Sequence, residues 1–140
     1  MGRPARRFDG PAARDAGTAI VEFVMVSVLL LMLLFGVLQV AAVFYIRNIV
    51  AASAADGARY AAGADVATAE GAPRASDLIR RGLSDSAARE IRCQAAQVAY
   101  GDSGLQLTRV ECRGRIRSLF VPVGRFISID IVGRAVKEGQ

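Results

Sequence analysis

An uninterrupted apolar segment near the N-terminus constrains this chain more than any other feature. The 24 residues from Phe23 to Ile46 carry no charge, and only Ser27 and Gln39 among them are distinctly polar. As an α-helix the segment would be about 36 Å long, which exceeds the roughly 30 Å hydrocarbon core of a bilayer. A chain of 140 residues cannot wrap an all-round apolar helix of that length. The segment therefore predicts a single membrane-spanning helix beside one small domain.

A secretory signal peptide is the alternative interpretation of this segment. The apolar region of such a peptide has about 7–15 residues, so the run observed here is too long. The small residues Ala52-Ser53-Ala54 would nevertheless suit a signal peptidase. Under this interpretation a small secreted domain begins at Ala55.

The charges that flank the segment predict its orientation. Four arginines precede it, offset by two aspartates, whereas the nearest basic residues after it are Arg47 and Arg59. Because cytoplasmic flanks carry the basic excess, we expect the N-terminus to be cytoplasmic and the chain from about Arg47 onward to be extracytoplasmic. This predicts a single-pass protein of the cytoplasmic membrane.

A carboxylate stands at the start of the apolar segment, which begins at Thr18. Glu22 is costly at this depth, and one interpretation places it simply at headgroup level. If a peptidase cut after Gly17, Thr18 would carry a free α-amine with a pKa near 8. That amine would lie about 6 Å of helix rise from Glu22. Glu22 could then neutralise an amine of its own or of a neighbouring subunit, offsetting its desolvation cost.

These residues carry a family resemblance. A basic leader that ends in Gly17, a Glu at the fifth position after it and a long apolar helix resemble the type IV prepilin pattern. Together with the motifs at 33–39 and 54–62, LLFGVLQ and AADGARYAA, the pattern at 17–23 resembles TadE-like proteins of tight-adherence (Flp) pilus systems. The resemblance covers roughly Gly17 to Ala62.

The resemblance implies a minor pilin or pseudopilin, with a structural and non-enzymatic role in pilus assembly. Gly17 and Thr18 would flank the cut made by a prepilin peptidase, and Glu22 would be the assembly carboxylate. The implied partners are the membrane, the peptidase, other pilin subunits and the assembly machinery. A pseudopilin of a secretion or DNA-uptake system and an uncleaved membrane-anchored binding protein remain alternatives.

Helical pattern continues beyond the membrane span. Residues 1–17 are predicted as the cytoplasmic leader, 18–62 as the transmembrane and stalk helix, and 63–73 as a linker that begins at Gly63. A stripe of small residues ends this helix, and a glycine within it costs about 1 kcal/mol relative to alanine. Gly57 therefore suggests close approach of another element, although an Ala-rich stretch can also be merely a good helix former. Gly36 and Gly57 are the candidate helix-packing positions.

The remainder, 74–140, predicts a small extracytoplasmic α+β domain. A short amphipathic helix covers 74–83, and strands cover 91–100 and 105–113 around the turn-forming residues 101–104. Folding that hairpin about its midpoint places Cys93 opposite Cys112, within disulfide reach. Such a bond would form outside the cytoplasm and stabilise the domain by roughly 3 kcal/mol, whereas the alternative is two buried thiols.

Two further strands are predicted, at 116–121 and at 126–136, where apolar and polar residues alternate. Helices first and strands later favour the α+β class, with an antiparallel β-meander packed by one face on the stalk helix. Four arginines at odd positions, 109, 113, 115 and 117, could form a basic stripe on one strand face. A solvated sheet face explains them more simply, and we do not expect nucleic acid as a partner.

Composition excludes several kinds of chemistry. The chain has no His, so Ser/His/Asp and Cys/His catalytic arrangements and His-based metal sites are excluded. Two Cys cannot provide a four-ligand zinc site without His. The sequence contains no phosphate-binding loop and no paired-acid pattern that would indicate an enzyme. We therefore expect no catalytic residues, no metal, no cofactor and no small-molecule substrate.

Overall fold

The computed structural model describes residues 12–101, 104–117 and 126–139, with the side chains at 12–17, 117 and 126 left out. The chain divides into two compact units, Met1–Leu38 and Gln39–Gln140. Helix α1 (Ala12–Ala62) contributes to both units. It ends directly before Gly63, where the sequence predicts its end.

The second unit follows α1 with short helices and then a sheet. The elements in order are η1 (Thr68–Glu70), α2 (Gly71–Gly82), α3 (Asp85–Arg89), β1 (Ile91–Tyr100), β2 (Leu105–Arg117) and β3 (Phe126–Val136). The three strands pair antiparallel in the order β1-β2-β3. The predicted α+β class and the antiparallel meander are confirmed.

The β1–β2 hairpin has the register that its turn predicts. Tyr100 faces Leu105 and Cys93 faces Cys112. Gly101 and Gly104 have φ angles of 54° and 72°. Residues with a side chain adopt such positive φ angles only with strain. These two glycines therefore let the chain reverse at the hairpin end.

Strand β2 is longer than predicted. Ile116 and Arg117 continue it and pair with Ile127 and Phe126 of β3, so the prediction of a separate strand at 116–121 is wrong for these two residues. The rest of that prediction, 118–121, lies outside the described residues. Gly114 lies inside this continuous strand and pairs with Ile91 and Ile129. A Cβ there would lie 2.5 Å from the carbonyl oxygen of Glu90, so this close approach requires a glycine.

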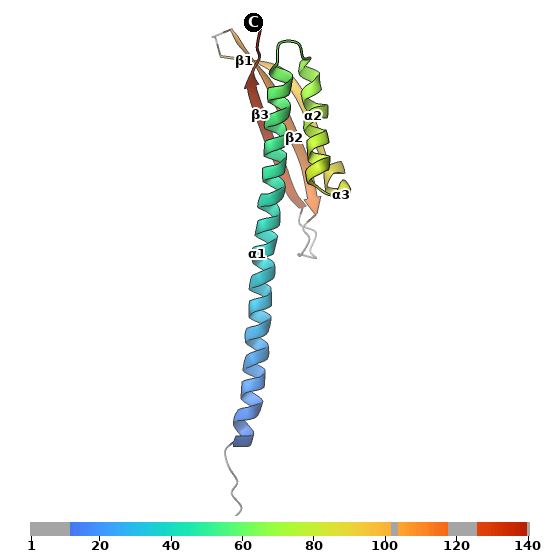
Figure 1. The fold of residues 1–140 in the computed structure, drawn as a ribbon. Helices are drawn as coiled ribbons and strands as arrows, with labels where there is room; N and C mark the ends of the chain where they lie inside the picture. Colours follow the sequence, from blue (N-terminus) through green and yellow to red (C-terminus); the bar gives the residue numbers. More distant parts are fainter. Residues whose placement is uncertain (1–11, 102–103, 118–125, 140) are drawn as a thin grey trace, which may run out of the picture. The chain divides into compact units, whose positions relative to one another are not determined.

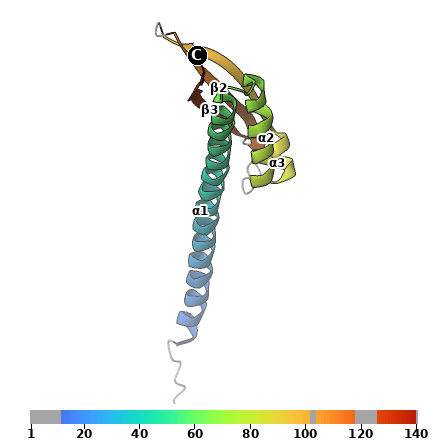
Figure 2. The ribbon, with the colours of Figure 1, turned by 45° about the horizontal axis from the view of Figure 1, so that its top comes forward.

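The last part of α1 and helix α2 lie on the same face of the sheet (Figure 1, Figure 2). From Val50 onward the predicted stripe of α1, which consists of Val50, Ala54, Gly57 and Ala61, is buried. Alternate strand residues, such as Val110 and Ile129, contribute the other wall of the core. The remaining buried apolar core residues are Ala54, Ala58, Ala75, Ile79, Ala88, Ile91, Cys112 and Ile116.

Glycines allow α1 to approach both neighbours closely. A Cβ at Gly57 would lie 2.5 Å from the carbonyl oxygen of Gly71 in α2 and 3.0 Å from the Cβ of Ala75. A Cβ at Gly133 of β3 would collide with the backbone of Ala54 in α1. Close approach, rather than helix propensity, thus accounts for the glycine at position 57.

Packing also explains where the short helices differ from their predicted bounds. Helix α2 begins at Gly71 instead of residue 74, because this glycine is buried against Ala61 of α1 and Val110 of β2. Helix α3 was not predicted. It is one short turn whose N-cap is Ser84, with the hydroxyl accepting from the backbone N–H of Ala87 at 3.4 Å, and it buries Ala88.

The single lysine of the chain closes the C-terminal end of α1. The Lys137 ammonium donates to the carbonyl oxygens of Ala61, Gly63 and Val66, at 3.1, 2.7 and 2.6 Å. The backbone N–H of Glu138 donates to the carbonyl oxygen of Ala62 at 2.8 Å. The last turn of a helix leaves carbonyls without intrahelical partners, and a cation there also favours the helix dipole. The two residues that follow β3 therefore cap the C-terminal end of α1 by hydrogen bonds.

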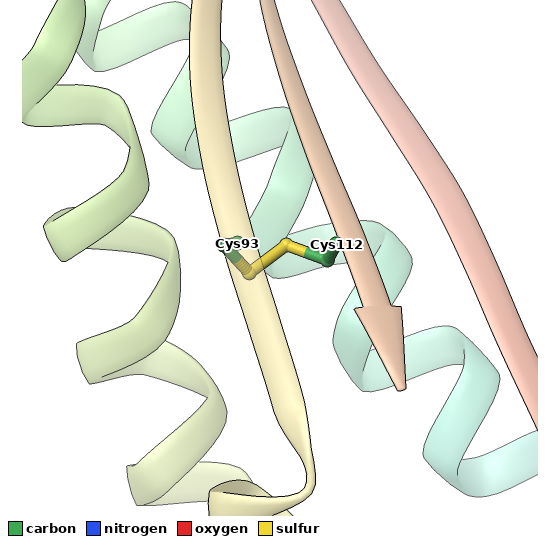
Figure 3. Close-up of a disulfide and its surroundings, with 2 residues drawn as sticks. All are labelled: Cys93 and Cys112. Atoms are coloured by element: carbon green, nitrogen blue, oxygen red, sulfur yellow. A yellow bond between two sulfur atoms is a disulfide. The ribbon is translucent and has the colours of Figure 1, made fainter. Parts of the chain in front are cut away.

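A disulfide joins the two strands of the first hairpin (Figure 3). Cys93 and Cys112 are directly opposed, with a Cα–Cα distance of 4.0 Å. Cys112 is fully buried and Cys93 is half-buried, on the face that packs against the helices. The bond therefore lies beside the core, which it constrains.

We expect Gly57→Val to destabilise the second unit. The added side chain must enter the contact with Gly71 and Ala75, and overpacking of this kind costs about 1–3 kcal/mol. Chemical denaturation of the full chain in detergent would measure the loss. Gly36→Val is the matched control, because a Cβ there meets nothing within 4 Å. Equal unfolding free energies for Gly57→Val and the unchanged protein would refute the close packing.

We expect removal of the disulfide to lower the unfolding free energy by roughly 3 kcal/mol, because the open chain gains loop entropy in the unfolded state. The double variant Cys93→Ser/Cys112→Ser would be compared with the unreduced protein in a denaturant titration. The matched control is the same variant with and without reductant, which should unfold identically. A double variant as stable as the oxidised protein would contradict this expectation.

Candidate functional site

The apolar helix of the first unit exposes almost its whole surface. From Thr18 to Leu38 every side chain except that of Ser27 is exposed, including Phe23 at 73% and Met32 at 72%. In the described residues, one helix is long and apolar enough to cross a membrane. An apolar surface of this extent needs lipid or another protein against it rather than water. The exposed apolar helix therefore fits a single-pass membrane protein.

Glu22 is the acidic residue of this exposed surface. Its side chain is exposed, and it forms no ion pair with the side chains described from residue 18 onward. Thr18 lies four residues earlier, so the two positions share one face of the helix. The structure therefore places the predicted assembly carboxylate one turn from the predicted new N-terminus, on a surface open to another molecule.

The predicted cleavage position lies inside a helix. Because α1 begins at Ala12, the bond between Gly17 and Thr18 belongs to helical backbone. Glycine is a weak helix former, by about 1 kcal/mol relative to alanine. Local opening of the helix is therefore easier at Gly17 than at Ala16.

The two candidate packing glycines differ in their surroundings. Gly57 contacts α2 within the second unit, as described above. Gly36 has open space where its Cβ would be, so no described part of this chain packs there. Any close contact at Gly36 must come from another molecule.

The predicted basic stripe is interrupted by acids. Glu111 lies between Arg109 and Arg113 on the face of the sheet away from the helices, and both arginines pair with it. The Nε of Arg113 also lies 3.3 Å from a carboxylate oxygen of Asp130 on β3. The Arg113–Asp130 pair, in which both side chains are exposed, contributes about 0–1 kcal/mol. This part of the stripe is an ion-paired, solvated sheet face, as the simpler interpretation predicts.

The sequence did not predict the role of Lys137. Its three acceptors lie more than 70 positions earlier in the chain, so no local pattern could have indicated the contact. Within the described ranges, no group of three or more Cys, Asp or Glu side chains could hold a metal ion.

The comparison with known families bears on the same segment. Residues 17–59 match the family model described as TadE-like protein. The match begins at Gly17 and ends at Arg59, so it covers the exposed apolar helix and most of the stripe that is buried against the sheet and α2. No curated protein and no solved structure matches the chain. The resemblance seen in the sequence is confirmed over this range, where the chain is similar to TadE-like proteins.

Proposed function

We propose that this protein is a pilin-like subunit of the cytoplasmic membrane that takes part, without catalysis, in assembling a tight-adherence pilus. One observation carries the proposal most directly. The TadE-like segment begins at Gly17 and continues as a helix whose apolar side chains are exposed along its length, with Glu22 on that surface. Such a helix can be stored in lipid and later packed against identical helices.

The charges support a cytoplasmic N-terminus. Arg3, Arg6, Arg7 and Arg14 precede the apolar helix, and cytoplasmic flanks are enriched in basic residues. The second unit would then lie outside the cytoplasm. Its Cys93–Cys112 bond supports the same assignment, because disulfides persist in oxidising compartments.

Cleavage after Gly17 would create the amine that Glu22 lacks. A new N-terminus at Thr18 would be mostly protonated at neutral pH. An ammonium and a carboxylate can enter an apolar assembly only as a pair, since either charge alone is strongly disfavoured there. Glu22 of one subunit would therefore select the processed end of its neighbour, and an unprocessed chain would offer no such partner.

Gly36 supplies a second feature of the proposed interface. Small residues let helix backbones approach closely in membranes, where packing replaces the hydrophobic effect as the driving force. The open space at Gly36 fits a contact with the helix of another subunit.

The test determines the N-terminal residue of membrane-extracted protein and counts surface pili in cells that carry each variant. We expect the unchanged protein to begin at Thr18. Glu22→Gln should insert into the membrane and keep its second unit folded, yet reduce piliation more than tenfold. The reason is that loss of one partner of a buried ion pair costs about 3–5 kcal/mol.

Two control variants sharpen this test. Glu22→Asp retains the charge and should retain most piliation, whereas Gly17→Phe should keep the leader attached and abolish piliation. Protein that still begins with its arginine-rich leader in piliated cells would refute the processing step. Normal piliation by Glu22→Gln would refute the role of the carboxylate.

A further inference from the structure

One end of the second unit lies where the apolar segment of α1 ends. That segment ends at Ile46, whose side chain packs against the core of this unit. The Tyr45 hydroxyl donates to the carbonyl oxygen of Gly82, the last residue of α2, at 3.3 Å. A Cβ at Gly82 would lie 2.9 Å from the side chain of Ile49. The C-terminal end of α2 therefore lies beside the last residues of the apolar segment and the first residues after it.

The other elements of the unit meet at the same end. Helix α3 follows α2 directly, and there β1 begins, β2 ends and β3 begins (Figure 1, Figure 2). Because the apolar segment adjoins this end, the end would face the surface of a membrane that the helix crosses. Tyrosine is typical of such a boundary, since its ring suits the apolar side and its hydroxyl the polar side. We call residues 45–49, 77–92, 113–116 and 127–130 the membrane-proximal end.

Arginines are concentrated at the membrane-proximal end. Those with described side chains are all exposed, namely Arg47, Arg80, Arg81, Arg89, Arg92, Arg113 and Arg115. The acids of this end are Asp77, Asp85, Glu90 and Asp130. The described side chains therefore give this end a positive net charge.

Most of these arginines are not neutralised by the described part of the chain. Arg81 pairs with Asp77 at 2.7 Å. Arg113 pairs with Asp130 at 3.3 Å, and also with Glu111. Among the described side chains, the other five arginines have no carboxylate partner, and the two remaining acids of this end are unpaired. The membrane-proximal end therefore has guanidinium groups available to an anionic partner.

The available charges surround this end instead of meeting in one cavity. Arg80 and Arg89 belong to α2 and α3. Arg92 and Arg115 lie on the sheet face away from these helices, because their neighbours Cys93 and the residues beside Arg115 face the core. Charges spread in this way fit an extended anionic surface better than a single small anion.

The opposite end of the unit has a different charge balance. Beside Arg59, one turn before the end of α1, it exposes the acids Asp65, Glu70 and Glu138. The ammonium of Lys137 is bonded to backbone carbonyl oxygens there. The unit is therefore polarised, and its positive end adjoins the apolar segment.

We propose that the membrane-proximal end docks on the anionic lipid headgroups of the membrane that α1 crosses. Headgroup phosphates accept charge-assisted hydrogen bonds from guanidinium groups, and an anionic surface attracts each arginine close to it. Arg80 lies more than 30 positions after Ile46, too far along the chain to oppose the predicted orientation of the span. The proposal rests on the membrane span of the proposed function and is independent of pilus assembly.

The test places the full chain in nanodiscs of phosphatidylcholine, alone or mixed with an equal part of phosphatidylglycerol, and measures hydrogen–deuterium exchange by mass spectrometry. The amides of residues 80–90 should exchange about fivefold more slowly in the anionic discs, which is the effect of one arginine near an anionic surface. Salt at about 1 M should remove this difference by screening. Residues 95–101 and 104–108, toward the far end of the hairpin, should exchange equally in both kinds of disc.

Two double variants identify the charges that matter. Arg80→Gln/Arg89→Gln should lose most of the slowing, while circular dichroism and an intact disulfide verify its fold. Arg59→Gln/Arg134→Gln is the matched control, because it removes the same charge from exposed positions outside the membrane-proximal end. The control should keep the slowing. Equal loss in both variants would show attraction by net charge alone and overturn the proposal.

Co-migration of the protein with the discs reports the membrane span separately from the docking. A chain that does not enter the discs would refute the span, and the docking with it. A chain that enters the discs but exchanges equally at residues 80–90 in both kinds would overturn the docking alone. A slowing that persists at high salt would show contact without charge recognition and would also overturn it.

Discussion

The second unit depends on the close approach of one helix to two neighbours. Small residues on α1 allow its backbone to contact α2 at Gly57 and β3 at Gly133. Such contacts bury little apolar area per residue, because alanine and glycine have small side chains. Supports that are not hydrophobic therefore add to the apolar core of the unit. The disulfide constrains the hairpin, and Lys137 holds the last turn of α1 to the end of β3.

Helix α1 meets two different physical requirements along its length. In the first unit its leucines, valines and phenylalanines face outward, which water does not favour. In the second unit its alanines and one glycine are buried against the chain's own sheet and α2. The residue types match these roles, since bulky apolar side chains suit lipid or a subunit interface and small ones suit tight internal packing. The TadE-like match covers most of both stretches, whereas the sheet that completes the second unit lies beyond it.

Local patterns predicted the features whose determinants are close together in sequence. The apolar run predicted the exposed helix, and Gly101 with Gly104 predicted a hairpin whose register places Cys93 opposite Cys112. The pattern failed where distant contacts decide the structure. The strand predicted over 105–113 continues to Arg117, because Gly114 and the residues after it pair with β3. Glu22 was singled out because a carboxylate is costly at the start of an apolar segment, and the resemblance to the prepilin pattern implies its role, which stays a prediction.

The capping of α1 by Lys137 has a chemical consequence for this sequence. The sequence contains one lysine, Lys137. Its ammonium group is half-buried and donates hydrogen bonds to three carbonyl oxygens. Reagents that acylate or alkylate primary amines thus meet one shielded target besides the free end of the polypeptide. Under mild conditions these reagents would modify the α-amine of the first residue almost exclusively. The arginine-for-lysine bias of the composition therefore makes the start of the chain a chemically addressable point.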